Sequence, residues 1–332
     1  MKKKIFLIVA VILIGLAFAA MGTLRAEAAP IKLTFSVFFP PTAGQTEAAV
    51  DWAKAVEKRT NGAVQITTFP GQTLLKANKT YAGVVKGLSD IGFSLFAYTR
   101  GRFPVMEAVD LPMGYPDGKV ATKVAYEFAK AFNPKELQDV KVLLLHAHGP
   151  GLLHTKKPVR TMGDLKGMKI RCTGLAAKVV KTLGGVPVAM PQPATYEALQ
   201  KGVVEGTFGP MEVLKTWRQA EVVKYTTKCY SVGYTTTFFI IMNLDKWKAL
   251  PADVQKVFEE VSKNYVPIFG GLWDVLDQEG ENHAVKRGNE MITLSEAEDA
   301  KWRKTVAPVI DEYIAAKPNG AAYVKKIRQL MK

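Results

Sequence analysis

Two segments of this sequence, TYAGVVKGLSDIGF at residues 80–93 and TYEALQKGVVEGTF at residues 195–208, align without a gap. They share Thr-Tyr at the start, Lys-Gly in the middle, an acidic residue near the end and a final phenylalanine. In both segments the first part has the apolar spacing of a helix, and the last residues have the composition of a buried strand. The agreement predicts that the chain contains one α/β unit twice.

The residues before each segment support this repeat. IKLTFS at residues 31–36 corresponds to MKIRCT at residues 168–173, and AVQITTFP at residues 63–70 corresponds to GVPVAMP at residues 185–191. Each block therefore alternates strand and helix, which is typical of parallel strands joined by crossover helices. We predict an α/β protein of two lobes, each a mainly parallel sheet flanked by helices.

The remaining segments indicate how the lobes are connected. HTKKPVRTMGDLKG at residues 154–167 reads as a polar passage into the second lobe, and YTTTFFIIMN at residues 234–243 as a buried strand leading back. The helical pattern of residues 250–290 is long enough to lie against both lobes. The predicted division is a signal at residues 1–28, lobe I at 29–153 plus about 240–282, and lobe II at 154–239 plus about 283–332.

The N-terminus has the order of a secretory signal. Three lysines at residues 2–4 precede an apolar run from Ile5 to Met21, and Ala26-Glu27-Ala28 follows. This order predicts export to the periplasm with cleavage after Ala28. An uncleaved membrane anchor remains the alternative, because the run is slightly long for a signal. No cysteine follows the run, so no lipoprotein anchor is expected.

The formal net charge of the chain is +15, and residues 1–28 contribute +3 of it, leaving +12. The lysines are spread along the chain, which argues against a nucleic-acid-binding surface. A diffuse positive field suits an anionic ligand, an acidic membrane surface, or solubility alone. Cys172 and Cys229 are too few for a disulfide framework, although one bridge between them remains open.

The segment DLKGMKIRCTG at residues 164–174 places an arginine near the end of a predicted strand. Two facing α/β sheets bind ligands in the crevice outside the carboxyl ends of their strands. Arg171 precedes the turn at Thr173 and Gly174, so we expect it to face this crevice. A guanidinium group binds carboxylates with two charge-assisted hydrogen bonds. The repeat aligns Arg171 with Thr34, so this charge belongs to one lobe only.

Aromatic residues gather at the predicted strand ends. The repeat aligns Phe93 with Phe208, so we expect these two rings to flank the crevice mouth from opposite lobes. Most aromatic side chains are core residues, and at least half of this set should be too. The other candidates for the crevice are Phe38, Phe96, Tyr98, Thr173, Pro210 and Tyr234, with Trp217 as a weaker one.

Histidines and glycines give no strong sign of catalysis. His146 and His148 lie on one face of the predicted strand at residues 140–149, but no nearby acid completes a metal site. We therefore expect no metal and no other cofactor, and His148 is placed to donate to a ligand oxygen. The sequence has no nucleophile elbow and no Cys-x-x-Cys, so we expect no enzyme. A Cys172 thiol activated by His148 remains the enzymatic alternative.

Three segments resemble the solute-binding proteins of tripartite ATP-independent periplasmic (TRAP) transporters, of the DctP type: DLKGMKIR at residues 164–171, TYEALQKGVVEG at 195–206, and MNLDKWKALPADVQKVFEE at 242–260. The resemblance extends over the mature chain. It implies periplasmic capture of an organic acid, delivery to a sodium-driven permease of small and large membrane subunits, and a long helix that braces both lobes. It also implies that Arg171 pairs with the ligand carboxylate. We expect a monomer.

Two departures from the family pattern bear on the ligand. Thr207-Phe208-Gly209-Pro210 stands where many members have Gln-Glu-Asn-Pro, and Gly151 stands about where sialic-acid-type members have a second arginine. Arg171 is then the single carboxylate clamp, and a second buried carboxylate without a partner is costly. We expect a monocarboxylate with a flat, apolar or aromatic body. The alternative ligand is an aliphatic keto or hydroxy acid. The alternative function is that of a similar two-lobed binding protein that serves an ATP-driven importer or a sensor.

Overall fold

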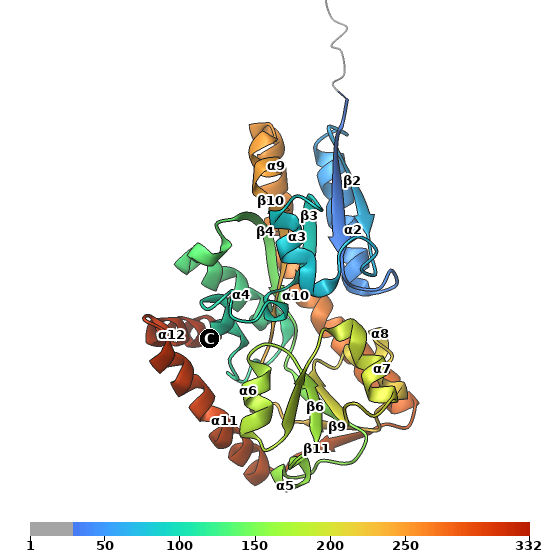
Figure 1. Ribbon diagram of the computed structural model, residues 1–332, viewed down its shortest axis with the longest axis vertical. Coiled ribbons are helices and arrows are strands. Elements are labelled where there is room, and N and C mark those ends of the chain that lie inside the picture. The colour runs from blue at the N-terminus through green and yellow to red at the C-terminus, as the bar shows by residue number, and fades with distance from the viewer. Residues whose placement is uncertain (1–28) are drawn as a thin grey trace, which may run out of the picture.

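The computed structural model describes residues 29–332 and has two lobes, each built on one sheet (Figure 1). The predicted signal and its cleavage site after Ala28 lie at or beyond the edge of the described residues. The predicted fold class, two α/β lobes with a long helix against both, is confirmed.

Lobe I contains a five-stranded sheet in the order β2-β1-β3-β10-β4. All strands run parallel except β10, which is antiparallel to both of its neighbours. Each residue of β10 is buried, as expected for a continuous apolar run in the middle of a sheet that is covered on both faces. The strands are β1 (Ile31–Val37), β2 (Val64–Phe69), β3 (Ile91–Leu95), β4 (Val140–Ala147) and β10 (Thr237–Asn243).

Lobe II contains a six-stranded sheet in the order β11-β9-β5-β8-β6-β7. Its one reversed strand is β5, which is antiparallel to β8 and β9. The predicted polar passage at residues 154–167 is therefore wrong in part, because its first residues end a buried central strand. The strands are β5 (Leu152–Thr155), β6 (Lys169–Cys172), β7 (Val186–Ala189), β8 (Gly206–Gly209), β9 (Tyr225–Lys228) and β11 (Glu290–Thr293).

The two sheets repeat one spatial order, which confirms the internal repeat. The order β2-β1-β3-β10-β4 of lobe I matches β7-β6-β8-β5-β9 of lobe II. Helices α3 (Thr80–Val85) and α7 (Thr195–Gln200) begin at the same Thr-Tyr of the repeat. The reversed strands, β5 and β10, are each the first strand after the chain crosses between the lobes. They run opposite to the others because the chain enters each sheet from the side of the crossing.

Helix α10 (Ala252–Lys286) contacts α2, α4 and β4 of lobe I, and α8 and β11 of lobe II (Figure 1). It buries Phe258, Phe269 and Trp273 in the core of lobe I, and its Gly280 lies close to Met211 of lobe II. The other helices are α2 (Gly44–Arg59), α4 (Gly118–Phe132), α5 (Met162–Leu165), α6 (Ala176–Thr182), α8 (Val213–Thr216), α9 (Leu244–Ala249), α11 (Glu296–Ala316) and α12 (Gly320–Leu330).

The C-terminal helices link the lobes a second time. Helix α11 packs on α6 of lobe II, whereas α12 packs on α4 of lobe I (Figure 1). The Tyr313 hydroxyl of α11 donates to the Pro104 carbonyl oxygen of lobe I at 2.8 Å. The predicted assignment of the whole segment 283–332 to lobe II therefore does not follow the packing, because α12 lies on lobe I.

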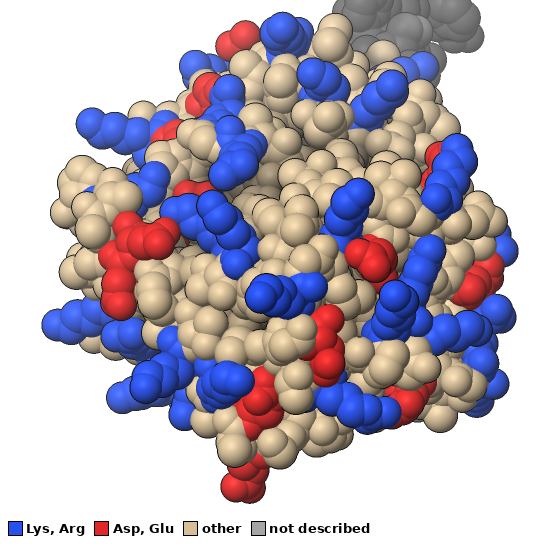
Figure 2. Space-filling view, turned by 60° about the horizontal axis from the view of Figure 1, so that its bottom comes forward, with Lys and Arg blue, Asp and Glu red and all other residues tan. Residues whose placement is uncertain are grey.

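Lysine and arginine side chains are spread over the face of the molecule shown in Figure 2, with aspartate and glutamate between them. The excess positive charge is thus diffuse on this face and does not form one patch. Among the helices of residues 29–332, none combines the length and hydrophobicity needed to cross a membrane.

Candidate functional site

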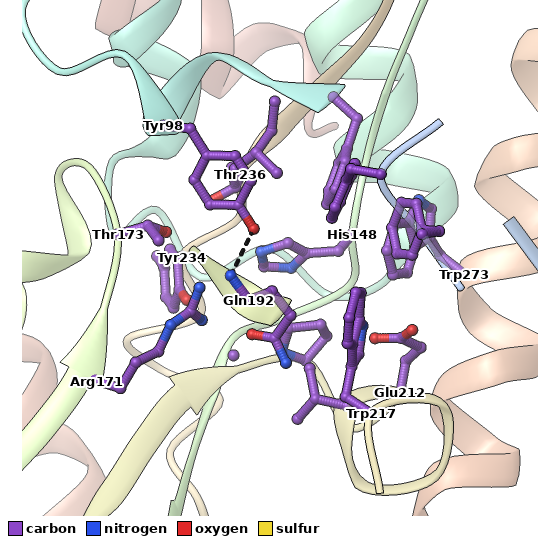
Figure 3. A pocket seen from close by; sticks show the side chains of 17 residues that line it. Tyr98, His148, Arg171, Thr173, Gln192, Glu212, Trp217, Tyr234, Thr236 and Trp273 are labelled. Atoms are coloured by element: carbon purple, nitrogen blue, oxygen red, sulfur yellow. Dashed lines mark hydrogen bonds between the residues drawn. The ribbon is translucent and has the colours of Figure 1, made fainter. Parts of the chain in front are cut away.

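A small cavity of about 40 Å³ lies between the lobes (Figure 3). Both sheets, both crossing segments (residues 148–151 and 229–236) and α10 contribute to it. The lining residues are Phe38, Phe39, Leu95, Tyr98, His148, Arg171, Thr173, Gln192, Gly209, Pro210, Glu212, Val213, Trp217, Tyr234, Thr236, Phe238 and Trp273.

Arg171 lies on β6 with only 4% of its surface exposed. Its Nε donates to the Met190 carbonyl oxygen at 3.0 Å, which fixes the side chain toward the cavity (Figure 3). Within residues 29–332, no carboxylate lies within ion-pair distance of this guanidinium group. A buried cation without a counter-ion is costly, so the arrangement indicates an anion-binding site.

The groups near Arg171 are polar but uncharged. Burial, together with the nearby Arg171 charge and against the opposing hydrogen bond to Gly149, lowers the pKa of His148 to about 4, so the imidazole is neutral at pH 7. Burial raises the pKa of Tyr98 and of Tyr234 above the ordinary tyrosine value. Arg171 is consequently the one charged group at this end of the cavity.

A wall of aromatic rings forms the rest of the cavity. Phe38 of lobe I stacks on Trp217 of lobe II, with ring centroids 6.2 Å apart and planes at 15°. Phe38 also stacks on Phe238 at 6.3 Å and 9°, and Phe238 packs on Trp273 at 5.0 Å. Such a wall suits a flat or apolar ligand body, because stacked pairs contribute about 0.5–1.5 kcal/mol beyond the burial of area.

Two hydrogen bonds cross between the lobes beside the cavity. The Gln192 backbone N–H of lobe II donates to the Tyr98 hydroxyl of lobe I at 2.9 Å (Figure 3). The Gln45 amide of α2 donates to Glu212 Oε1 of lobe II at 3.0 Å. Together with the contact between Phe38 and Trp217, these bonds hold the lobes in a closed arrangement.

The structure brings seven of the ten residues that the sequence predicts for the site to the cavity. These are Phe38, Tyr98, His148, Arg171, Thr173, Pro210 and Tyr234. The weaker candidate Trp217 lines it as well.

Phe93, Phe96 and Phe208 do not line the cavity. Phe93 is fully buried on β3 and packs edge-on against Phe269 of α10 at 5.9 Å. Phe96 packs against Phe239 at 5.0 Å inside lobe I. Phe208 lies behind the ring of Tyr234, with centroids 4.7 Å apart. Its carbonyl oxygen accepts the Tyr234 hydroxyl at 2.8 Å, so Phe208 supports a lining residue from the core.

The strand pairing also corrects the predicted counterpart of Arg171. Arg171 pairs with Thr207 on β8, and Ser36 pairs with Gly92 on β3. Gly92 and Thr207 occupy the same position of the repeat, so Arg171 corresponds to Ser36 and not to Thr34. Both aligned segments, IKLTFS and MKIRCT, have a lysine as their second residue. Matching these lysines shifted the sequence alignment by two residues. The conclusion that the charge belongs to one lobe is unchanged, because Ser36 is uncharged.

Sequence reasoning missed several lining residues. The polar ones are Gln192, Glu212 and Thr236, and the apolar ones are Phe39, Leu95, Gly209, Val213, Phe238 and Trp273. Glu212 had a usable signal, because it follows the predicted Pro210 by two residues at the end of β8. Gln192 supplies an amide from just before the second Thr-Tyr. The family pattern used in the sequence analysis concerns residues 207–210, so it did not indicate an amide at Gln192.

Glu212 is the one acidic residue among the lining residues, and only 1% of its surface is exposed. Burial raises the pKa of Glu212 to about 7, and the Gln45 amide and the Thr216 side chain offset part of this increase. Its backbone N–H donates to Asp277 Oδ1 of α10 at 2.8 Å. Figure 3 shows Glu212 across the cavity from Arg171.

His146 and His154 are structural. Burial lowers the pKa of His146 well below its ordinary value, and its Nδ1 accepts the Trp273 indole N–H at 2.9 Å. His154 contacts the Thr226 hydroxyl and the Gly209 carbonyl oxygen, and burial lowers its pKa to about 4. In the described part of the chain, no group of three or more histidine, cysteine, aspartate or glutamate residues is arranged to hold a metal ion.

Cys172 and Cys229 are both buried and both free, so the possible bridge between them is not formed. Burial raises the pKa of the Cys172 thiol to about 11, which opposes formation of the thiolate. A neutral thiol is a poor nucleophile, so the geometry gives no support to the enzymatic alternative that pairs Cys172 with His148.

A closed cavity between two α/β lobes, with one buried cation and an aromatic wall, defines a two-lobed binding protein for an organic anion. The sequence model of "Bacterial extracellular solute-binding protein, family 7" (DctP) matches residues 35–317. The chain belongs to this family, as the resemblance of its motifs predicted.

Individual relatives agree with this assignment. The C4-dicarboxylate-binding periplasmic protein DctP of Rhodobacter capsulatus is 28% identical over 295 residues, which cover 86% of this chain and 87% of the relative. A TRAP periplasmic solute-binding protein of Desulfovibrio salexigens, solved as an open complex, is 37% identical with a TM-score of 0.79. The match covers 91% of this chain and 96% of that one.

A TRAP solute-binding protein of Rhodoferax ferrireducens, solved with copurified benzoate, is 27% identical with a TM-score of 0.86. The match covers 91% of this chain and 97% of that one. This chain is thus more similar in shape to the benzoate complex than to the open complex, although its sequence is more similar to the latter. The lower TM-score against the open complex agrees with the closed arrangement of this chain's lobes.

Proposed function

We propose that this protein captures an organic monocarboxylate with a flat, apolar or aromatic body and delivers it to a TRAP-type permease. The observation that carries the proposal is Arg171, a buried cation without a counter-ion in a cavity walled by aromatic rings. The ligand carboxylate would supply the missing charge, and the rings would pack against the rest of the ligand. The benzoate found in the Rhodoferax ferrireducens structure supports an acid of this kind.

A diacid fits this cavity less well. Arg171 is the one lysine or arginine among the lining residues, and His148 is neutral at pH 7. A second ligand carboxylate would therefore lie without a partner, which is costly in a buried site. Ionised Glu212 would repel it as well. We accordingly place the ligand apart from the C4-dicarboxylates after which the Rhodobacter capsulatus relative is named.

The remaining parts of the proposal follow the family. The protein acts in the periplasm, after cleavage of its signal behind Ala28, as a monomer that docks on small and large membrane subunits of a permease. It has no catalytic activity. Intact-mass measurement on a periplasmic extract tests the export step: the expected product begins Ala29-Pro30, and a mass that includes Met1 in the membrane fraction would contradict cleavage.

A thermal-shift screen followed by isothermal titration calorimetry tests the ligand class. The panel pairs benzoate, phenylacetate, mandelate and phenylpyruvate with succinate, malate and sialic acid. We expect a response to at least one aromatic acid and none to the diacids, because one carboxylate clamp is available. Tight binding of a diacid without a response to any aromatic acid would overturn the proposal.

A further inference from the structure

We propose that Glu212 forms a second polar end of the cavity, which selects carboxylates that carry a hydroxyl or N–H donor on the part furthest from the carboxylate. This inference rests on the proposed function and refines its ligand class. It commits to a ligand with one anionic end, an apolar or aromatic middle and a neutral donor at the other end.

The Glu212 carboxyl group has acceptor capacity beyond its protein partners. Oε1 accepts the Gln45 amide at 3.0 Å, and the Thr216 side chain also hydrogen-bonds to this carboxyl group. Glu212 is almost fully buried, yet it lines the cavity. The two oxygens of an ionised carboxylate together have about four acceptor positions. A ligand donor inside the cavity can therefore bind at a position that Gln45 and Thr216 leave open.

The backbone around Glu212 is held firmly by α10. Asp277 Oδ1 accepts the Glu212 N–H at 2.8 Å. Gly280 of the same helix lets the preceding loop approach closely, because a Cβ atom at this position would lie 2.2 Å from the Met211 carbonyl oxygen. A polar group on a rigid support discriminates between ligands better than a group on a mobile loop. The Glu212 side chain therefore starts from a fixed backbone position, from which it can bind a donor at one position of the ligand.

Gln192 supports the same ligand chemistry. Its Nε2 is a buried donor without a partner among the described residues, and its side chain lines the cavity. The cavity thus offers an acceptor at Glu212 and a donor at Gln192 in addition to Arg171. A ligand that is entirely apolar beyond its carboxylate would leave Gln192 unpaired and the open acceptor position of Glu212 unused. A ring hydroxyl, which can donate and accept, is the simplest substituent that suits such a cavity.

Arg171 does not neutralise Glu212 directly. Tyr98 responds to both charges, since Arg171 lowers its pKa and Glu212 raises it, whereas Arg171 is absent from the causes that shift the pKa of Glu212. Figure 3 shows the two charged side chains on opposite sides of the cavity, with Gln192 and Trp217 between them in this view. The separation leaves each group to bind its own part of the ligand.

The test is calorimetry with pairs of acids that differ in one hydroxyl: benzoate and phenylacetate, each with its three ring-hydroxylated isomers. In the unaltered protein, we expect at least one hydroxylated isomer to bind about ten-fold more tightly than its parent. In Glu212→Leu the preference should fall to about one, whereas the affinity for the parent acid should fall only about two- to ten-fold, because this variant also removes the bond to Gln45 between the lobes. Glu212→Gln should keep part of the preference, because its amide oxygen still accepts.

Glu197→Gln is the matched control, because it removes an exposed acid of lobe II that pairs with Lys201 outside the cavity. It should leave the hydroxyl preference unchanged. If aromatic acids bind but show no hydroxyl preference, or a preference that Glu212→Leu retains, the inference fails and the proposed function stands. If no aromatic acid binds at all, the proposed ligand class fails and the inference falls with it.

Discussion

Arg171 is held in place before any ligand arrives. One hydrogen bond, from Nε to Met190, fixes its direction, and its remaining donors face a cavity without a carboxylate partner. The unliganded protein therefore carries the cost of a buried charge, and the ligand anion removes it. Binding energy at this site depends on both the charge and the forked geometry of the guanidinium group.

We expect Arg171→Ala to abolish measurable binding while the fold remains intact. Loss of one partner of a buried charge pair costs about 2–5 kcal/mol, which is roughly thirty-fold to several thousand-fold in affinity. Arg171→Lys should also bind poorly, because an ammonium group cannot reproduce the fork. Calorimetry with the best ligand of the screen measures both effects. Arg160→Ala, which removes an exposed arginine paired with Glu290, is the control. Affinity in Arg171→Ala equal to that control would remove Arg171 from the site.

Glu212 gives a prediction on stability and pH. Its folded-state pKa of about 7 exceeds the ordinary 4.5, so the folded protein binds more protons than the unfolded chain between these pH values. The contribution of Glu212 to stability is thus lost as pH rises from about 4.5 to 7. Glu212→Gln removes this loss and should stabilise the protein more at pH 8 than at pH 5, by at most about 3 kcal/mol. Urea unfolding of both proteins at the two pH values measures the difference.

The Glu212 charge also raises the pKa of Asp277, so Glu212→Gln should lower that pKa and add to the stabilisation at pH 8. The shifted pKa of His148 does not depend on Glu212 and cancels in this comparison. A stability difference between Glu212→Gln and the unaltered protein that is the same at pH 5 and pH 8 would contradict the raised pKa.

The sequence predicted Arg171 but not Glu212, and the reason is the range of the interactions that place them. A strand end followed by a glycine turn is a local pattern, and it positions Arg171. The direction of Glu212 depends on Asp277 and Gly280 of α10, which lie more than sixty residues later in the chain. No local pattern contains that contact. Gly151 is similar: a Cβ atom there would lie 2.0 Å from the Tyr234 ring, so an arginine at this position is excluded by a distant residue.

At the scale of elements, the repeat predicted one α/β unit in each lobe but not the direction in which each side chain points. Phe93 and Phe208 occupy equivalent places on β3 and β8, yet both rings point into the cores. The cavity wall comes instead from segments at the strand ends, where Phe38 follows β1 and Trp217 follows α8. Alternation along a strand fixes which residues share a face, but a shift of one residue exchanges the two faces.

This difference between core and wall predicts two separate mutational effects. Phe93→Ala should destabilise the protein by about 3–5 kcal/mol, because it leaves a cavity in a close-packed core. Trp217→Ala, which removes a partly exposed ring, should reduce ligand affinity by about three- to ten-fold with a smaller loss of stability. Urea unfolding and calorimetry on both variants distinguish the effects. A Phe93→Ala protein of unchanged stability, or a Trp217→Ala protein of unchanged affinity, would contradict this division.

At the scale of the whole molecule, four connections set the movement of the lobes. The chain crosses at residues 148–151, at residues 229–236, along α10, and from α11 to α12. The crossing segments are short and lie at the back of the cavity, where they contribute His148 and Tyr234 to its lining. Small changes in these segments can therefore open the lobes while each sheet stays intact, which is a hinge movement.

The closed arrangement should depend on the two hydrogen bonds that cross the cavity. Tyr98→Phe removes the acceptor of the Gln192 N–H, and Gln45→Ala removes the donor to Glu212. Each bond contributes about 0.5–1.5 kcal/mol, so each variant should open the unliganded protein and weaken binding by about two- to ten-fold. Small-angle X-ray scattering without ligand should show a larger radius of gyration in both variants than in the unaltered protein.

Tyr81→Phe is the matched control for this experiment, because its hydroxyl donates to Asp139 at 2.6 Å within lobe I. It removes the same phenolic group without touching the contact between the lobes, so it should lower stability and leave the scattering unchanged. Opening measured without ligand separates closure from direct ligand contact, which matters for Tyr98 because it also lines the cavity. If Tyr98→Phe and Gln45→Ala have the same radius of gyration as Tyr81→Phe, the prediction is wrong. The Phe38–Trp217 contact and α10 then hold the lobes together, and the two hydrogen bonds form as a result of closure and do not cause it.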